Sequence, residues 1–254
     1  MAIQVILVPA GAEHQAVMRG LKGVRSAPPV IPVPAGPTAF RACLQSWEDR
    51  ARFADQEILL IGLGGSLAPR HRVGDAILLE QVLNAAGELP TESSDRPKSS
   101  LKGETLSQTQ PLFKGGRGDR LAQCDRTLTE SLAQRLKIPI GTGVMCDRII
   151  TTVAEKRRLG DRYQADVVDM ESAVLLEAMP QAKVAILRVI SDDCSHDLPD
   201  ISGAIGPDGS LRAGTLARSF LKRPMAALNF ISGSLQGLNA LEQFTLALFG
   251  PASG

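Results

Sequence analysis

The chain has few of the residues that bind metals or form disulfides. Its four cysteines form no Cys-x-x-Cys pair, which argues against a zinc knuckle and against a disulfide framework. Its three histidines are scattered, without the spacing of a zinc motif. We therefore expect reduced, mostly structural thiols and predict neither a metal nor an organic cofactor. The cysteines are Cys43, Cys124, Cys146 and Cys194.

An excess of charge of either sign is also absent. Lys and Arg number 28 and Asp and Glu number 27, so no strong field favours nucleic acid or an anionic membrane. No run of about 18 uninterrupted apolar residues occurs, the length that a membrane-spanning helix needs. The N-terminus lacks a basic segment followed by an apolar stretch and a cleavage site. These absences predict a cytoplasmic protein without nucleic-acid partners or membrane insertion.

Short apolar runs rich in β-branched residues alternate with helical patterns along the chain. Ile3–Val8, Glu57–Ile61 and Val184–Ile190 are typical of strands buried on both faces. Strands that alternate with helices predict an α/β fold, a three-layer sandwich with a mixed, largely parallel central sheet flanked by helices. A chain of 254 residues suits a single domain over residues 1–254.

Local signals predict several further elements. A helix is expected over Thr38–Arg50 and a strand over Arg148–Thr151. The polar stretch 84–119 is rich in Gly, Ser, Lys and Pro, and we expect a mobile loop there. A C-terminal helical segment covers about 214–249, with an interruption at Pro224.

A capping box over Thr152–Glu155 predicts the start of a short helix through Leu159. Three consecutive cations, Lys156-Arg157-Arg158, lie on that helix. We interpret them as a solvated helix face, which is the usual place for a run of charge.

Glycines follow the strand Glu57–Ile61 and predict a loop over Gly62–Leu67. The pattern fails the dinucleotide fingerprint because position 67 is leucine, and it fails the phosphate loop because no Gly-Lys-Ser/Thr follows. Its backbone can still approach a ligand closely, and Gly64, Gly65 and Ser66 could offer N–H groups to an oxyanion or a water molecule. A tight strand exit without a ligand explains the pattern equally well.

Three carboxylates, those of Glu13, Glu171 and Asp192, each follow a predicted strand. The helix dipole stabilises a carboxylate in a first turn by about 0.3–1 kcal/mol, so capping alone explains Glu171. Capping of the following turn explains Asp192. Three acids at three strand ends of one sheet are harder to dismiss together, because α/β proteins bind ligands at such edges.

These residues belong to an ordered set of motifs. The segment Val168–Ala173, with Arg188–Asp192 downstream and Gly62–Ser66 and Val73–Asp75 upstream, resembles the nucleoside phosphorylase/nucleosidase superfamily. That superfamily includes methylthioadenosine/S-adenosylhomocysteine nucleosidases and purine nucleoside phosphorylases. The combination is far more specific than any single match. The resemblance implies cleavage of the N-glycosidic bond of a purine nucleoside, either adenosine or a 5′-substituted adenosine, by phosphorolysis or hydrolysis.

The tail carries a second, weaker similarity. Asp197-Leu198-Pro199, Asp208-Gly209 and Arg223-Pro224 are similar to the hopanoid-associated phosphorylase branch of the superfamily. This branch is named for phosphorolysis, so inorganic phosphate is a candidate co-substrate. Family members often complete the pocket with side chains of a neighbouring subunit, and the resemblance therefore implies a homo-oligomer.

The resemblance also assigns residues to the nucleoside. Glu171 would accept hydrogen bonds from ribose hydroxyls, and Met170 would contact the ribose through its backbone N–H and its side chain. Ser191 belongs to the same nucleoside-binding set. Ile149 occupies a place where family members often carry an aromatic ring that stacks on the base, so this chain departs from the family pattern at that position.

Two acids would carry the chemistry. The resemblance gives Asp192 the role of protonating N7 of the departing purine, and it gives Glu13 the role of positioning a water molecule. Free aspartate titrates near pH 3.9, so burial would have to raise the pKa of Asp192 for it to transfer a proton near neutrality.

Two alternatives remain open. A phosphorylase needs cationic groups or several N–H donors around phosphate, and Arg19, Arg70 and Arg72 are candidates outside the aligned motifs. Glu13 near that position would repel phosphate and favour water. The chain could also be a nucleoside-binding protein without turnover, because Ile149 replaces an aromatic residue and the stretch 84–119 matches no recognised family segment.

Overall fold

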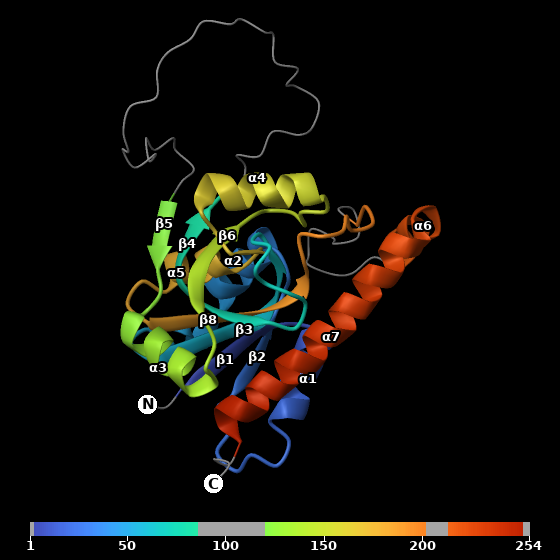
Figure 1. Cartoon of the computed structure of the whole chain (residues 1–254). Helices are drawn as coiled ribbons and strands as arrows, with labels where there is room; N and C mark the ends of the chain where they lie inside the picture. Colours follow the sequence, from blue (N-terminus) through green and yellow to red (C-terminus); the bar gives the residue numbers. More distant parts are fainter. Residues whose placement is uncertain (1–2, 86–119, 202–212, 251–254) are drawn as a thin grey trace, which may run out of the picture.

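A computed structural model describes residues 3–85, 120–201 and 213–250 (Figure 1). The strands in these ranges are β1 (Val5–Pro9), β2 (Val30–Val33), β3 (Glu57–Ser66), β4 (Ala76–Asn84), β5 (Arg120–Gln123), β6 (Ile140–Met145), β7 (Val167–Asp169) and β8 (Lys183–Asp192). The helices are α1 (Ala12–Gly20), α2 (Pro37–Ser46), the 3₁₀-helix η1 (Glu48–Phe53), α3 (Arg126–Leu136), α4 (Val153–Tyr163), α5 (Ser172–Ala178), α6 (Ala213–Lys222) and α7 (Pro224–Phe249).

The strands form one mixed sheet in the order β2-β1-β3-β7-β6-β4-β5, and β8 pairs with both β3 and β4. Five of the eight strand pairs in the described ranges are parallel, which confirms the predicted mixed, largely parallel sheet. Because β8 bridges β3 and β4 while β7 and β6 connect the same two strands, this part of the sheet closes on itself. The closure was not predicted.

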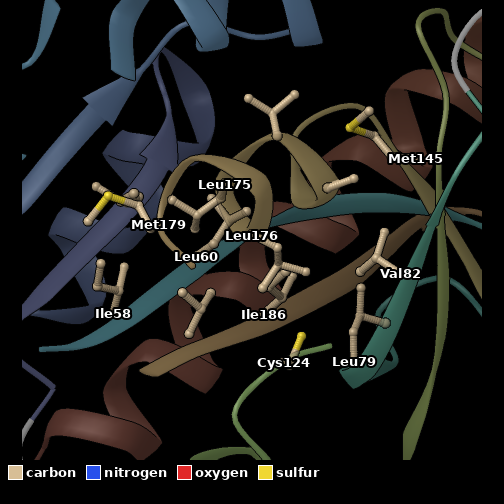
Figure 2. Packing of buried hydrophobic residues seen from close by; sticks show 14 of the residues in the cluster. Ile58, Leu60, Leu79, Val82, Cys124, Met145, Leu175, Leu176, Met179 and Ile186 are labelled. Atoms are coloured by element: carbon tan, nitrogen blue, oxygen red, sulfur yellow. The ribbon is translucent and has the colours of Figure 1, made fainter. Parts of the chain in front are cut away.

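Alternate residues of the central strands supply two hydrophobic cores. In β1, Leu7 packs into the core beneath α2 and α5, whereas Ile6 packs into the core beneath α1, α3 and α7. Figure 2 shows the first core, where Leu175 of α5 lies above Leu60 and Ile186 of the sheet. Each fully buried aliphatic side chain contributes roughly 1.5–3 kcal/mol of hydrophobic stabilisation. The predicted three-layer sandwich is confirmed.

One predicted helix boundary and one predicted strand are wrong. Helix α2 ends at Ser46, since Trp47 takes up an extended conformation and stacks on Phe53 at a ring separation of 5.3 Å. The predicted strand over Arg148–Thr151 does not form. Arg148 instead forms an ion pair with Glu155 of α4, while Ile150 packs into a core with that helix.

The predicted glycine loop is also wrong, because β3 continues through it to Ser66. Gly62 lies opposite Arg188 of β8, and Gly65 lies opposite Asp192 after a bulge between Gly64 and Gly65. Strand β7 pairs with the last two residues of β3 on its other side. A Cβ atom on Gly64 would lie only 2.8 Å from Cγ1 of Val167. Strand β3 can therefore pair with β7 at this point only because Gly64 has no side chain.

The C-terminal prediction is confirmed, since α6 and α7 meet at Pro224. The described residues contain no helix with both the length and the apolar character needed to cross a bilayer. Residues 86–119 of the predicted mobile loop and the Asp208-Gly209 pair lie outside the described ranges.

Helices α1 and α7 lie side by side along one face of the sheet (Figure 1). Arg19 of α1 forms an ion pair of 2.6 Å with Glu242 of α7. A Cβ atom on the neighbouring Gly20 would lie 2.5 Å from the backbone oxygen of Glu242. The helices therefore approach so closely that only glycine fits at this contact.

Replacing Gly20 with alanine should lower the free energy of unfolding by about 1–3 kcal/mol, because the added methyl group overpacks the contact between α1 and α7. Gly214 of α6 is the matched control, since an added Cβ atom there meets no other atom within 4 Å. Gly214→Ala should leave stability unchanged or raise it by up to about 1 kcal/mol. Urea unfolding measures both; equal midpoints for the two variants would contradict the packing described.

Candidate active site

A pocket of about 200 Å³ lies where β1, β3, β7 and β8 end. Its floor is formed by backbone of β3 and by the acidic ends of β7 and β8, and its walls come from the Arg148–Ile150 segment and from α7. The strand pairing thus gathers residues from four distant parts of the sequence. The predicted site residues that line it are Glu13, Gly64, Gly65, Ile149, Met170, Glu171, Ser191 and Asp192.

Ser66 is the predicted site residue that the structure does not bring to the pocket. Its side chain is fully buried, and its hydroxyl donates to the backbone oxygen of Ala68 at 2.8 Å. Because β3 continues to this residue, its side chain turns into the protein rather than towards a ligand. The Ser66 hydroxyl is therefore no ligand of the pocket, and the predicted backbone N–H donor at Ser66 stays a prediction.

Arg188 occupies the centre of the site beneath the pocket. This fully buried residue of β8 donates through Nε to Oδ2 of Asp169 at 2.7 Å, and its Nη2 lies 3.4 Å from Oε2 of Glu171. Asp169 also accepts from the hydroxyl of Ser172 at 2.6 Å. Sequence reasoning quoted Arg188 only as part of a motif. A cation inside the apolar run of β8 was the signal that could have identified it.

Glu171 stands at the N-cap of α5 but forms no capping hydrogen bond with its side chain. Its Oε1 instead accepts from the backbone N–H of Gly36 at 2.9 Å. Burial raises the pKa of Glu171 against the opposing effect of Arg188, and the nearby Asp169 adds to the rise. Helix capping does not explain this residue, whose buried carboxyl lines the pocket.

Glu13, in the first turn of α1, faces the same part of the pocket. Its Oε1 accepts from the backbone N–H of Leu63 at 2.6 Å. Desolvation by the surrounding protein raises the pKa of Glu13 to about 7, so this carboxyl exchanges its proton near neutrality.

An unused donor lies beside that carboxyl. Nη1 of Arg188 is buried and has no hydrogen-bond partner among the described residues. A Cβ atom on Gly62 would lie 2.6 Å from this nitrogen and 2.8 Å from Oε1 of Glu13. The absence of a side chain at Gly62 thus lets the donor and the carboxyl approach the same point.

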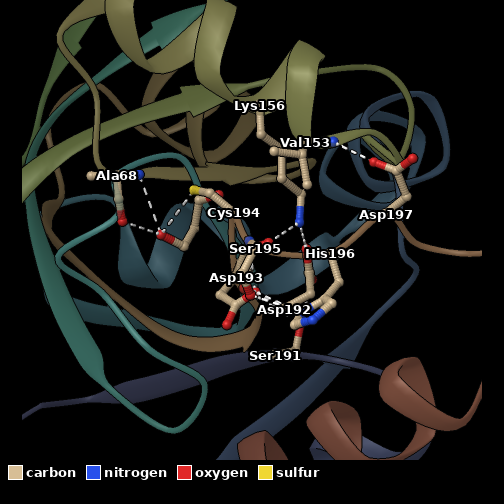
Figure 3. Close-up of polar contacts among 12 residues, drawn as sticks. Ala68, Val153, Lys156, Ser191, Asp192, Asp193, Cys194, Ser195, His196 and Asp197 are labelled. Carbon is tan, nitrogen blue, oxygen red and sulfur yellow. Dashed lines mark hydrogen bonds and ion pairs between the residues drawn. The ribbon is translucent and has the colours of Figure 1, made fainter. Parts of the chain in front are cut away.

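Asp192 lies at the other end of the pocket and accepts hydrogen bonds on both oxygens. The hydroxyl of Ser191 donates to Oδ1 at 2.9 Å, and Nζ of Lys156 contacts Oδ2 (Figure 3). Lys156 also donates to the backbone oxygen of Asp193 at 2.8 Å. The interpretation of Lys156 as part of a solvated face is wrong, because its side chain is fully buried.

The apolar walls include an aromatic ring from an unexpected element. Met170 and Ile149 line the pocket as predicted, and Phe230 of α7 adds a phenyl ring. Sequence reasoning predicted only a C-terminal helical segment here and missed this role. The tertiary position of α7, which no local pattern encodes, brings the ring to the site.

The three arginines considered for phosphate are not in the pocket lining. Arg19 pairs with Glu242 and Arg70 pairs with Asp166. Arg72 is exposed. Arg148 is the cation in the lining, and Glu155 already pairs with it.

Replacing Glu13 with glutamine should raise the free energy of unfolding relative to that of the wild type, and this difference should grow as the pH rises. Between the unfolded pKa of 4.5 and the folded pKa of about 7, folded Glu13 keeps a proton that the unfolded chain has lost. Wild-type stability is therefore lost as pH rises through this window, whereas glutamine does not titrate. Urea unfolding from about pH 5 to about pH 8 should show the variant gaining about 2–3 kcal/mol over the wild type. A constant difference would refute the raised pKa.

Replacing Arg188 with methionine should lower the free energy of unfolding by about 3–5 kcal/mol, because Asp169 and Glu171 would remain buried without their cation. Arg126→Met is the control, since Arg126 lies 89% exposed in a surface pair with Glu130. Its unfolding midpoint should match the wild type. Equal midpoints for all three proteins in chemical denaturation would show that the buried network does not stabilise the fold.

Solved structures of similar fold include nucleosidases and a hydrolase. Futalosine hydrolase of Helicobacter pylori strain 26695 has a TM-score of 0.62 at 15% identity, covering 96% of this chain and 95% of its own. A 5′-methylthioadenosine/S-adenosylhomocysteine nucleosidase from Helicobacter pylori, solved with butyl-thio-DADMe-Immucillin-A, has a TM-score of 0.61 at 15% identity, covering 96% and 97%. A putative nucleosidase of the same kind from Francisella philomiragia has a TM-score of 0.61 at 16% identity, covering 98% of each chain.

Identity as low as this supports the fold alone. A comparison with curated proteins finds no match. The family model described as the phosphorylase superfamily matches residues 35–222, which include Glu171, Arg188 and Asp192. Since the match spans well over half of the sequence, the chain belongs to the phosphorylase superfamily, the group of nucleoside phosphorylases and nucleosidases that its motifs resemble.

Proposed function

We propose that the protein cleaves the N-glycosidic bond of a purine nucleoside, adenosine or a 5′-substituted adenosine, with water as the acceptor. The observation that carries this proposal is the arrangement of three carboxyls along one pocket. Glu13 and Glu171 lie around the buried Arg188, and Asp192 lies at the opposite end beside Lys156. The proposed reaction uses the nucleoside and water, with no cofactor.

The chemistry matches that arrangement. Breaking the glycosidic bond builds positive charge on the ribose and negative charge on the departing base, as in glycoside hydrolysis. A buried carboxylate at Glu171 stabilises the cationic sugar and accepts hydrogen bonds from its hydroxyls. Asp192 faces the base and passes a proton to it, while Ser191 fixes the orientation of the carboxyl through its hydrogen bond to Oδ1.

Water suits the sugar end of the pocket better than phosphate. Glu13, with a pKa of about 7, can take a proton from an attacking water molecule near neutrality. Nη1 of Arg188 offers that water a hydrogen bond. Phosphate would meet the carboxyls of Glu13 and Glu171, and the cation of the lining, Arg148, is paired with Glu155.

The apolar walls support a purine with its sugar. Met170 and Ile149 can pack on the nucleoside, and Phe230 supplies an aromatic face. The names of the similar structures, nucleosidases for 5′-methylthioadenosine and a futalosine hydrolase, also support a 5′-substituted nucleoside and hydrolysis. The predicted homo-oligomer stays a prediction.

Incubation with a panel of purine nucleosides, with and without phosphate, tests the proposal by mass analysis of products. The free sugar is the expected product; ribose 1-phosphate would identify a phosphorylase instead. Tight binding without release of base would identify a nucleoside-binding protein.

Asp192→Asn should lower kcat by about 10²- to 10⁴-fold while substrate binding persists, because it removes the group that passes a proton to the base. Asp193→Asn is the matched control, since the Asp193 carboxylate accepts from the backbone N–H of Ser195 at 2.9 Å and does not line the pocket. Its kcat should match the wild type. Base release by Asp192→Asn at the wild-type rate would refute the assigned role.

A further inference from the structure

Lys156 is a fully buried lysine that reaches the end of the pocket from outside the strands that form its floor. Thr152 caps α4 by accepting from the backbone N–H of Glu155 at 3.3 Å, which sets the first turn of the helix. Lys156 shares the inner face of α4 with Leu159 and Tyr163 at helical spacing. Its side chain runs from this face to Asp192, as Figure 3 shows.

Stability does not account for this burial. Moving an ammonium group out of water costs several kcal/mol, and apolar pairs of similar volume often stabilise a fold as well as buried ion pairs do. The Lys156 ammonium is satisfied by the carboxylate of Asp192 and the backbone oxygen of Asp193. Asp192 is the last residue of β8 and Asp193 follows it, on the side of the pocket assigned to the base. We therefore attribute the burial of Lys156 to a role in the pocket and not to stabilisation of the fold.

Asp192 alone lacks a proton to give. Its Oδ1 accepts from the hydroxyl of Ser191, and its Oδ2 accepts from the ammonium of Lys156, as an ionised carboxylate does. A departing purine nevertheless requires a proton. The ammonium in contact with Asp192 carries protons that it can transfer.

We propose that Lys156 is the proton source for Asp192, so that the two side chains protonate the departing base as one unit. The proposal rests on the proposed cleavage reaction. As the bond between C1′ and N9 breaks, its electron pair goes to the purine. Asp192 delivers a proton to N7, and Nζ of Lys156 gives a proton to Asp192 and becomes a neutral amine. Water adds to C1′ and loses a proton to Glu13, and solvent exchange then restores Lys156 and Glu13.

The role predicts an effect that depends on the leaving group. A purine needs protonation, whereas a 4-nitrophenyl group leaves as a stable phenolate. Lys156→Met should therefore lower kcat on the purine nucleoside by about 10²- to 10⁴-fold and leave kcat on 4-nitrophenyl β-ribofuranoside unchanged. Equal losses on both substrates, or no loss on the purine nucleoside, would overturn the proposal.

Lys156→Arg separates proton transfer from charge. Arginine keeps the cation beside Asp192 but does not lose a proton in proteins, so this variant should fold like the wild type and remain slow on the purine nucleoside. Recovery of the wild-type rate would overturn the proposal, because charge alone would then suffice. Arg157→Met, at an exposed neighbour on α4, is the control and should keep the wild-type rate.

A double-mutant cycle tests the coupling between Lys156 and Asp192 with purine nucleosides as the only substrates. If the two side chains act as one unit, Lys156→Met combined with Asp192→Asn should be no slower than the slower single variant. Multiplied losses would overturn the proposal. These outcomes are distinct from failure of the proposed function, which would appear as a wild-type protein that releases no purine at all.

Discussion

The site depends on one buried cation. Arg188 is held in the middle of β8, where apolar residues surround it, and its guanidinium contacts Asp169 and Glu171 at the junction of β7 and α5. Without that charge, two carboxyls would be desolvated at the centre of the sheet, which is strongly unfavourable. The ion-pair network therefore couples the packing of the sheet to the geometry of the pocket, and the strands cannot shift without disturbing the acids.

The same cation opposes the effect of burial on the pKa values of two neighbouring carboxyls. Glu171 lies within reach of Nη2, whereas Glu13 approaches the unpaired Nη1 and keeps a pKa of about 7. In the proposed reaction, Glu171 lies beside the sugar and Glu13 exchanges a proton with water.

The sequence predicted the framework better than the contacts within it. Apolar runs identified the strands because burial on both faces leaves a local signature, and the acids were found because each follows such a run. The burial of Lys156 could not be predicted from its charge, although its helical spacing with Leu159 and Tyr163 places it on the same face of α4 as these two residues. Gly62–Ser66 were assigned to a loop because glycine disfavours strands, and the pairing with both β7 and β8 that overrides this preference is a long-range property.

Strands form the floor of the pocket, whereas other segments form its walls, and the two parts can change independently. The acids lie at the end of β8, at the N-cap of α5 and at the start of α1, so their positions are fixed by the core. Phe230 and Ile149 belong to elements outside the sheet and can be exchanged without rebuilding the network around Arg188. Preference for one nucleoside over another can therefore diversify while the bond-breaking machinery stays constant.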